Sequence, residues 1–148
     1  MYRNILIATD GSALADKAVS HGLALAKSVG AKVTALTVEA PFNVYDVRES
    51  KMGQMSEAFA HHAEHSKQHA AHVLDRVAKA AAANGLSCET VQVEHDHPYQ
   101  AIITTAKNKA SDLIVMASHG RSGISAVLLG SVTNKVLTHT SIPVLVCH

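Results

Sequence analysis

Residues 117–131 read ASHGRSGISAVLLGS and place glycines and serines around one short apolar run. The segment lies between residues 111–118, whose apolar composition predicts a buried strand, and residues 131–140, which carry a helical pattern. Glycines let the backbone approach a ligand closely, and Gly130 leads into a helix whose first N–H groups have no intrahelical partner. With the helix dipole, those donors suit a phosphate. The sequence predicts an anion-binding loop, in which Ser131 either caps the helix or turns its hydroxyl to a phosphate oxygen.

The same glycine-rich segment also fits a simpler structure. Glycine spacing is weak evidence on its own, and an ordinary turn followed by a serine N-cap matches these residues equally well. A Walker-type loop is excluded, because that motif requires a lysine immediately before the serine and this chain has Gly130 there. Any ligand for the loop therefore depends on the residues around it.

Few side chains near this loop are suited to catalysis. Phosphoryl transfer relies on cations that neutralise developing charge and on a group that positions a nucleophile. Asp10, His119 and Arg121 are the candidates, and a histidine in a polar loop more often makes hydrogen bonds than transfers protons. Ser12 and Ser122 follow glycine-rich turns without the G-x-S-x-G pattern of a nucleophile elbow. The sequence favours binding over turnover.

A histidine stripe is the other chemical feature. An α-helix turns by about 100° per residue. On the helix predicted over residues 56–84, this places four histidines on one side, opposite the apolar residues. We expect this stripe to be solvent-exposed. Histidines four residues apart can chelate Zn²⁺, Ni²⁺ or Cu²⁺, but a solvated polar face without metal fits the same pattern. The stripe consists of His61, His65, His69 and His72, and the apolar side of Phe59, Ala70, Val77 and Ala81.

Alternating strands and helices must position these residues. Five β-type runs cover residues 4–10, 32–40, 86–95, 111–118 and 142–148, and helical patterns cover 12–30, 56–84, 98–110 and 131–140. The connections are too long for hairpins, so the pattern predicts an α/β domain with a parallel sheet and helices on both faces. The first and fourth runs are almost continuously apolar and should be central. Residues 40–56 fit neither period and predict a long loop, either a lid or an unstructured connection.

Composition limits the class of protein. The chain has 148 residues, 47% hydrophobic and 17% charged, which indicates a single domain over residues 1–148. A net charge of +1 gives no electrostatic reason to bind nucleic acid or an anionic membrane. No apolar run approaches a signal-peptide core or a membrane span, so we expect a cytoplasmic protein. Cys88 and Cys147 lack metal-ligand spacing and are expected to be buried thiols.

With these features together, the chain resembles the universal stress protein family. ATP-binding members carry Gly, two residues, Gly, nine residues, then Gly-Ser or Gly-Thr. Here the pattern falls on Ala117, Gly120 and Gly130-Ser131, with alanine in place of the first glycine. The opening MYRNILIATDGS and the closing SIPVLVCH extend the resemblance over the whole chain. It implies a three-layer α/β/α fold of the adenine nucleotide alpha hydrolase-like type, with a five-stranded parallel sheet of order 3-2-1-4-5.

The resemblance also implies a site for ATP, with or without Mg²⁺, and at most a slow ATPase activity. The end of strand one would lie beside the adenosine and the backbone of Val38 beside the adenine edge, while the glycine loop would hold ribose and phosphates. Asp10 either caps the first helix or contacts ribose or Mg²⁺. The implied binding residues are Ala8, Thr9, Asp10, Val38, Met116, Ala117, His119, Gly120, Arg121, Gly130, Ser131 and Val132.

Two functions follow from the resemblance. The first is a nucleotide-responsive stress or signalling module, and the second is a family member that binds no nucleotide and acts through its dimer and partner surfaces. Ala117 separates them, because a methyl group at a position of positive φ, or one pointing into the site, would weaken nucleotide binding. Relatives pair their last strand across a two-fold axis, so the chain is expected to form a homodimer that buries Val144 and Val146.

Overall fold

The computed structural model describes residues 1–41, 52–120 and 128–148. Nine elements follow one another as β1 (Asn4–Ala8), α1 (Ala13–Val29), β2 (Lys32–Glu39), α2 (Met52–Ala83), β3 (Cys88–Glu94), α3 (Pro98–Asn108), β4 (Leu113–Ala117), α4 (Ser131–His139) and β5 (Val144–Cys147). The strands form one parallel sheet of order β3-β2-β1-β4-β5, which confirms the predicted fold class. The strand order reverses between β1 and β4.

The sheet separates two hydrophobic cores, because successive strand residues point to opposite faces. Ile5 and Ile7 of β1 belong to the core beneath α1 and α2, whereas Leu6 belongs to the core beneath α3 and α4. All three are 1% exposed or less. The prediction that the first and fourth runs form central, doubly covered strands is confirmed.

Helix α1 begins and ends where its sequence predicts. Ser12 is the N-cap, and its hydroxyl accepts a hydrogen bond from the amide of Ala15 at 3.2 Å. Gly30 ends the helix in the left-handed conformation, with φ 72°, which glycine adopts at little cost. The interpretation of Asp10 as the helix cap was wrong, because the cap is two residues further on.

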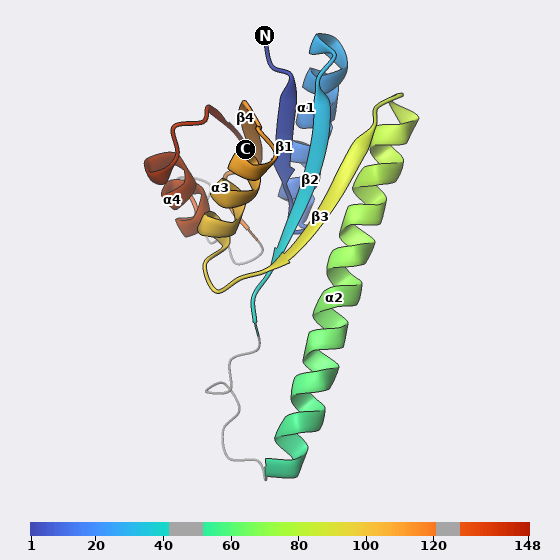
Figure 1. The fold of residues 1–148 in the computed structure, drawn as a ribbon, viewed down its shortest axis with the longest axis vertical. Coiled ribbons are helices and arrows are strands. Elements are labelled where there is room, and N and C mark those ends of the chain that lie inside the picture. The colour runs from blue at the N-terminus through green and yellow to red at the C-terminus, as the bar shows by residue number, and fades with distance from the viewer. Residues whose placement is uncertain (42–51, 121–127) are drawn as a thin grey trace.

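Helix α2 is longer than its sequence predicts. It was expected over 56–84 and runs over Met52–Ala83, so the predicted loop over 40–56 is wrong at its end, and residues 42–51 lie outside the described part. In Figure 1 the helix lies beside β3 and its first turns extend well past the carboxyl ends of the strands. Among the side chains of α2 that the structure describes, the first buried one is Ala70. An ion pair of 2.6 Å between Arg76 and Asp16 joins α2 to α1.

Candidate functional site

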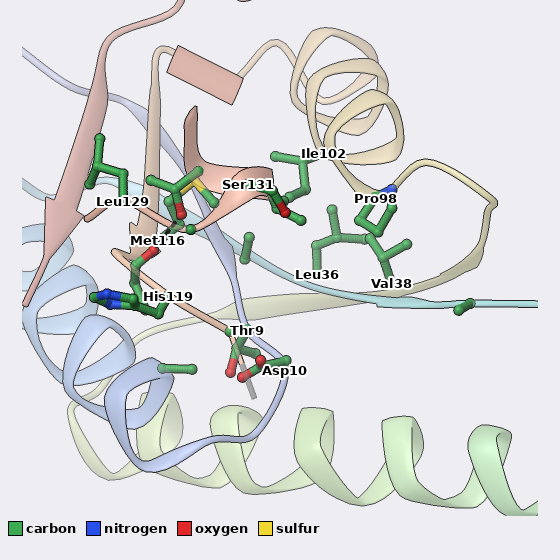
Figure 2. Close-up of a pocket in the computed structure, with 18 of the residues that line it drawn as sticks. Thr9, Asp10, Leu36, Val38, Pro98, Ile102, Met116, His119, Leu129 and Ser131 are labelled. Carbon is green, nitrogen blue, oxygen red and sulfur yellow. Dashed lines mark hydrogen bonds between the residues drawn. The ribbon is translucent and has the colours of Figure 1, made fainter. Parts of the chain in front are cut away.

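A cavity of about 600 Å³ opens at the carboxyl ends of β1, β2 and β4 (Figure 2). This position is the point where the strand order reverses, which is where open parallel sheets bind ligands. Its volume is within the range of pockets that hold small molecules and cofactors. The structure brings together in its lining the predicted residues Ala8, Thr9, Asp10, Val38, Met116, Ala117, His119, Gly120, Gly130, Ser131 and Val132, whereas Arg121 lies outside the described residues.

The cavity has two chemically different ends. Figure 2 shows Leu36, Val38 and Pro98 at one end, and His119 and Leu129 at the other. Sequence reasoning missed part of this lining, namely Ala15, Leu36, Pro98, Ile102, Leu129 and Thr133. Helices α1, α3 and α4 all begin at this edge of the sheet. The sequence could therefore have predicted that the first residues of each helix line the cavity. The apolar end suits a flat ring, and the other end lies beside the glycine loop.

The start of α4 differs from the start of α1. Gly130 is the N-cap of α4, with φ −61° and ψ 156°, and glycine has no side chain with which to cap the helix. The suggestion that Ser131 caps α4 is therefore wrong: Ser131 is the first helical residue and is exposed in the cavity lining. The first N–H groups of α4 thus lie at the cavity without a cap from the N-cap residue, and uncapped N–H groups at a helix start bind anions.

Gly130 is required for close packing. Its amide donates to the carbonyl of Ser118 at 2.7 Å. A Cβ built on Gly130 would lie 3.2 Å from that carbonyl oxygen and 3.3 Å from the Cα of His119. Both neighbours are backbone atoms, which move only if the loop moves. The glycine therefore lets α4 begin directly against the end of β4.

Asp10 lies across the cavity from α4. One carboxylate oxygen, Oδ1, accepts from the amide of Ser12 at 2.9 Å and holds the turn into α1. The other, Oδ2, would lie 3.1 Å from a Cβ on Gly120, so the glycine loop passes close to this carboxylate. Thr9 is buried beside it, and its carbonyl accepts from the Thr37 hydroxyl at 3.0 Å. Asp10 is thus a fixed negative charge at the edge of the cavity.

Ala117 ends β4 in ordinary strand geometry. Ala110 is the only non-glycine residue with positive φ in the described ranges, so Ala117 has no backbone strain that a glycine would relieve. Its side chain is 7% exposed and belongs to the core beneath α1 and α2. The Thr133 hydroxyl donates to its carbonyl at 2.9 Å, and this buried bond ties α4 to β4. Alanine in place of the first glycine of the family pattern therefore does not put a side chain at a position of positive φ.

The histidine stripe is only partly as predicted. His61, His65 and His72 are exposed, but His69 is half-buried, because α2 meets the sheet edge immediately before buried Ala70. In the portion of the chain that the structure describes, no three histidine, cysteine or carboxylate side chains are grouped to hold a metal ion.

The cysteines are free thiols. Cys147 is buried, as predicted, while Cys88 is half-buried. Removal from water raises the pKa of both thiols, because burial disfavours the thiolate. Neither cysteine lines the cavity.

Among the described helices, none combines the length and apolar character needed to cross a membrane.

Comparisons with known proteins agree with this architecture. A model of the universal stress protein family matches residues 1–148. Universal stress protein MJ0531 of Methanocaldococcus jannaschii is 34% identical over 148 residues, covering 99% of this chain and 82% of that protein. Universal stress protein YxiE of Bacillus subtilis is 31% identical over 147 residues, covering 99% of both chains.

Solved structures show the same fold. The structure of MJ0577, also from M. jannaschii, has a TM-score of 0.81 at 26% identity and covers 99% of this chain and 96% of its own. A universal stress protein in complex with cAMP has a TM-score of 0.72 at 26% identity, covering 99% of this chain and 97% of its own. The chain belongs to the universal stress protein family.

Proposed function

We propose that this protein binds ATP in the cavity and acts as a nucleotide-responsive module. The observation that carries the proposal is the start of α4, where Gly130 and Ser131 bring N–H groups without a side-chain cap to the cavity. Helix α1 begins at the same edge, but Ser12 already caps it. The phosphates of a nucleotide are therefore expected at α4.

The apolar end of the cavity would hold the adenine. The carbonyl of Leu36 accepts from the amide of Thr9, so alternate residues of β2 direct their backbone groups toward β1. Val38 is the next residue of β2 that directs its backbone groups to this side. Leu36 pairs with Ala8, the last residue of β1, so Val38 lies beyond the end of β1. Its backbone groups are thus positioned to meet the polar edge of a purine. Adenine-nucleotide binding by a relative supports this proposal, because that universal stress protein was solved with cAMP.

Asp10 would contact the ribose hydroxyls or help to hold Mg²⁺. Mg²⁺ is commonly bound by one or two carboxylates together with substrate phosphates, and Asp10 supplies one carboxylate at the cavity edge. Oδ1 accepts from the amide of Ser12, and Oδ2 lies beside Gly120 at the cavity edge.

We propose binding rather than turnover. Phosphoryl transfer needs cations around the transferred group, and the described lining of the cavity contains neither lysine nor arginine. His119 contacts Ser118 through Nδ1 at 2.7 Å, so this nitrogen is already engaged. The site is therefore proposed to hold a nucleotide without hydrolysing it.

Titration of the purified, nucleotide-free protein tests the proposal. Calorimetry with ATP, with adenosine and with GTP, each with and without Mg²⁺, should show saturable binding of ATP and weaker binding of GTP. Failure to bind ATP under either condition would contradict the proposal and favour a member that acts through its surfaces alone.

We also propose that the protein forms a homodimer through β5. The carbonyls of Pro143 and Cys147 accept from the amides of Ile114 in β4 and of Ser118 directly after it. Since alternate residues of a parallel strand direct their backbone groups to opposite sides, Val144 and Val146 direct theirs to the open edge. An open edge strand is a template for pairing with another chain.

A further inference from the structure

The pairing of β1 with β2 stops one step before Val38. The last register pair is Ala8 with Leu36, and the amide of Thr9 then donates to the carbonyl of Leu36 at 2.9 Å. A parallel ladder that continued would next join the amide of Val38 to the carbonyl of Thr9. These two described residues do not form that bond. The Val38 N–H is therefore directed toward the end of β1 without an acceptor from the ladder.

A buried hydroxyl occupies the carbonyl of Thr9 instead. Oγ1 of Thr37 donates to this carbonyl at 3.0 Å, and the direction is certain because a carbonyl oxygen can only accept. Successive residues of β2 point to opposite faces of the sheet: Ala35 belongs to the core beneath α1 and α2, whereas Leu36 and Val38 belong with the core beneath α3 and α4. Thr37 thus lies on the α1 and α2 side, and it holds the Thr9 carbonyl toward that side.

The Val38 N–H lies at the apolar end of the cavity. Val38 lines the cavity, and its side chain points from β2 toward Pro98 (Figure 2). Thr37 is 4% exposed and does not line the cavity. The edge of an adenine carries a nitrogen acceptor beside an amino donor. A base bound at this end would therefore supply the acceptor that the Thr9 carbonyl does not.

We infer that Thr37 is a positioning residue that keeps the Val38 N–H available to the adenine base, by holding the Thr9 carbonyl away from it. Without the hydroxyl, the buried carbonyl would need another donor, and the next donor in the ladder is the Val38 amide. The ladder would then lengthen by one bond and compete with the base. This inference rests on the proposed nucleotide binding and adds a role for a side chain that does not touch the ligand.

Hydrogen exchange of the Val38 amide, followed by NMR in the nucleotide-free protein, tests the positioning directly. In the wild type this amide should exchange quickly, because the ladder gives it no acceptor. Thr37→Val removes the hydroxyl but keeps the branched shape, and it should slow the exchange about tenfold. Thr37→Ser keeps the hydroxyl and should exchange like the wild type. Thr133→Val, which loses a buried hydroxyl bond to the Ala117 carbonyl, is the matched control and should leave the Val38 rate unchanged.

Calorimetry tests the consequence for the ligand. Thr37→Val should weaken the binding of adenosine and of ATP by the same factor, about threefold to tenfold, because both molecules carry the base. Thr37→Ser should bind both as tightly as the wild type does. Inorganic triphosphate lacks the base, so any affinity that it has for the wild type should be the same for Thr37→Val.

Three results would overturn the inference: slow exchange of the Val38 amide in the nucleotide-free wild type, an unchanged rate in Thr37→Val, or a loss of affinity for ATP but not for adenosine. Urea denaturation checks that each variant is folded, and Thr37→Ala replaces Thr37→Val if the latter is not. A wild type that binds neither adenosine nor ATP would instead overturn the proposed function and the ligand role of Val38. The exchange rates, measured without nucleotide, would then still decide whether Thr37 controls the Val38 amide.

Discussion

The amide of Gly130 donates a 2.7 Å hydrogen bond to the carbonyl of Ser118, and a Cβ on Gly130 would lie 3.2 Å from that same oxygen. One backbone atom of the residue directly after β4 thus both anchors the start of α4 and excludes a side chain from it. Backbone atoms therefore set the distance between the end of β4 and the start of α4. The proposed phosphate site depends on this distance.

Substitution of Gly130 should weaken ATP binding in proportion to side-chain size. Gly130→Ala requires a shift of a few tenths of an ångström and should cost less than Gly130→Val, whose branched side chain displaces the loop. Overpacking of this kind costs about 1–3 kcal/mol, so we expect a tenfold to hundredfold loss of ATP affinity in Gly130→Val. Calorimetry measures both variants.

Gly30→Ala is the matched control for Gly130. Gly30 has φ +72° and no atom within 4 Å of a built Cβ, so alanine there meets strain but no clash. We expect a loss of about 1–2 kcal/mol in the free energy of unfolding and an unchanged ATP affinity. Equal losses of affinity in Gly30→Ala and Gly130→Val would show that global stability, rather than the phosphate site, controls binding.

Ala117→Gly should not improve ATP binding. Ala117 has no positive φ, and its methyl group packs beneath α1 and α2, so glycine removes packing without relieving strain. The free energy of unfolding should fall by about 1 kcal/mol, while ATP affinity changes less than twofold. Urea denaturation and calorimetry test the two parts. A large gain in affinity would mean that the methyl group obstructs the nucleotide.

Gly11 should be intolerant of alanine because of α2. Its φ is +79°, and a built Cβ would lie 2.5 Å from Cγ2 of Val73. Gly11→Ala should destabilise the protein by about 2–4 kcal/mol, from left-handed strain and overpacking together. In a double-mutant cycle, Val73→Ala should reduce the cost of Gly11→Ala but not abolish it, since the strain stays. Strictly additive effects in urea denaturation would contradict the clash.

Val146→Pro should dissociate the proposed dimer. Proline removes one outward N–H of β5 and leaves the hydrogen bonds from Ile114 and Ser118 to β5 in place. Val146→Ala, which keeps the N–H, is the control and should stay dimeric. Light scattering at micromolar concentration distinguishes the two states, and a monomeric wild type would refute the dimer.

Alkaline pH should destabilise the protein through its cysteines. Burial raises the pKa of Cys88 and Cys147, so above about pH 8.5 the unfolded chain loses thiol protons that the folded chain keeps. The free energy of unfolding therefore falls as the pH rises through this range. The double variant Cys88→Ala/Cys147→Ala should show a shallower decline in denaturation measured from pH 7 to 10. An identical slope would exclude the thiols as its cause.

The strand order and the central strands could be predicted because they depend on long apolar runs and on the family resemblance. The start of α2 could not, since residues 52–56 carry no clear apolar period on which to place a helix. The N-cap of α4 was also missed, because residue preferences favour Ser131, whereas contact with Ser118 places Gly130 at the cap. The roles of Ser118 and Thr133 depend on contacts across the fold that no local pattern contains.

The 32-residue helix α2 would be about 48 Å long, and among its described side chains the buried ones begin at Ala70. Its backbone hydrogen bonds should therefore open by two different routes. Amides near Val73, Val77 and Ala81 should exchange with deuterium only through global unfolding. Amides near residues 60–66 should exchange through local fraying. Their exchange rates should stay the same when core stability is lowered, as in Gly11→Ala.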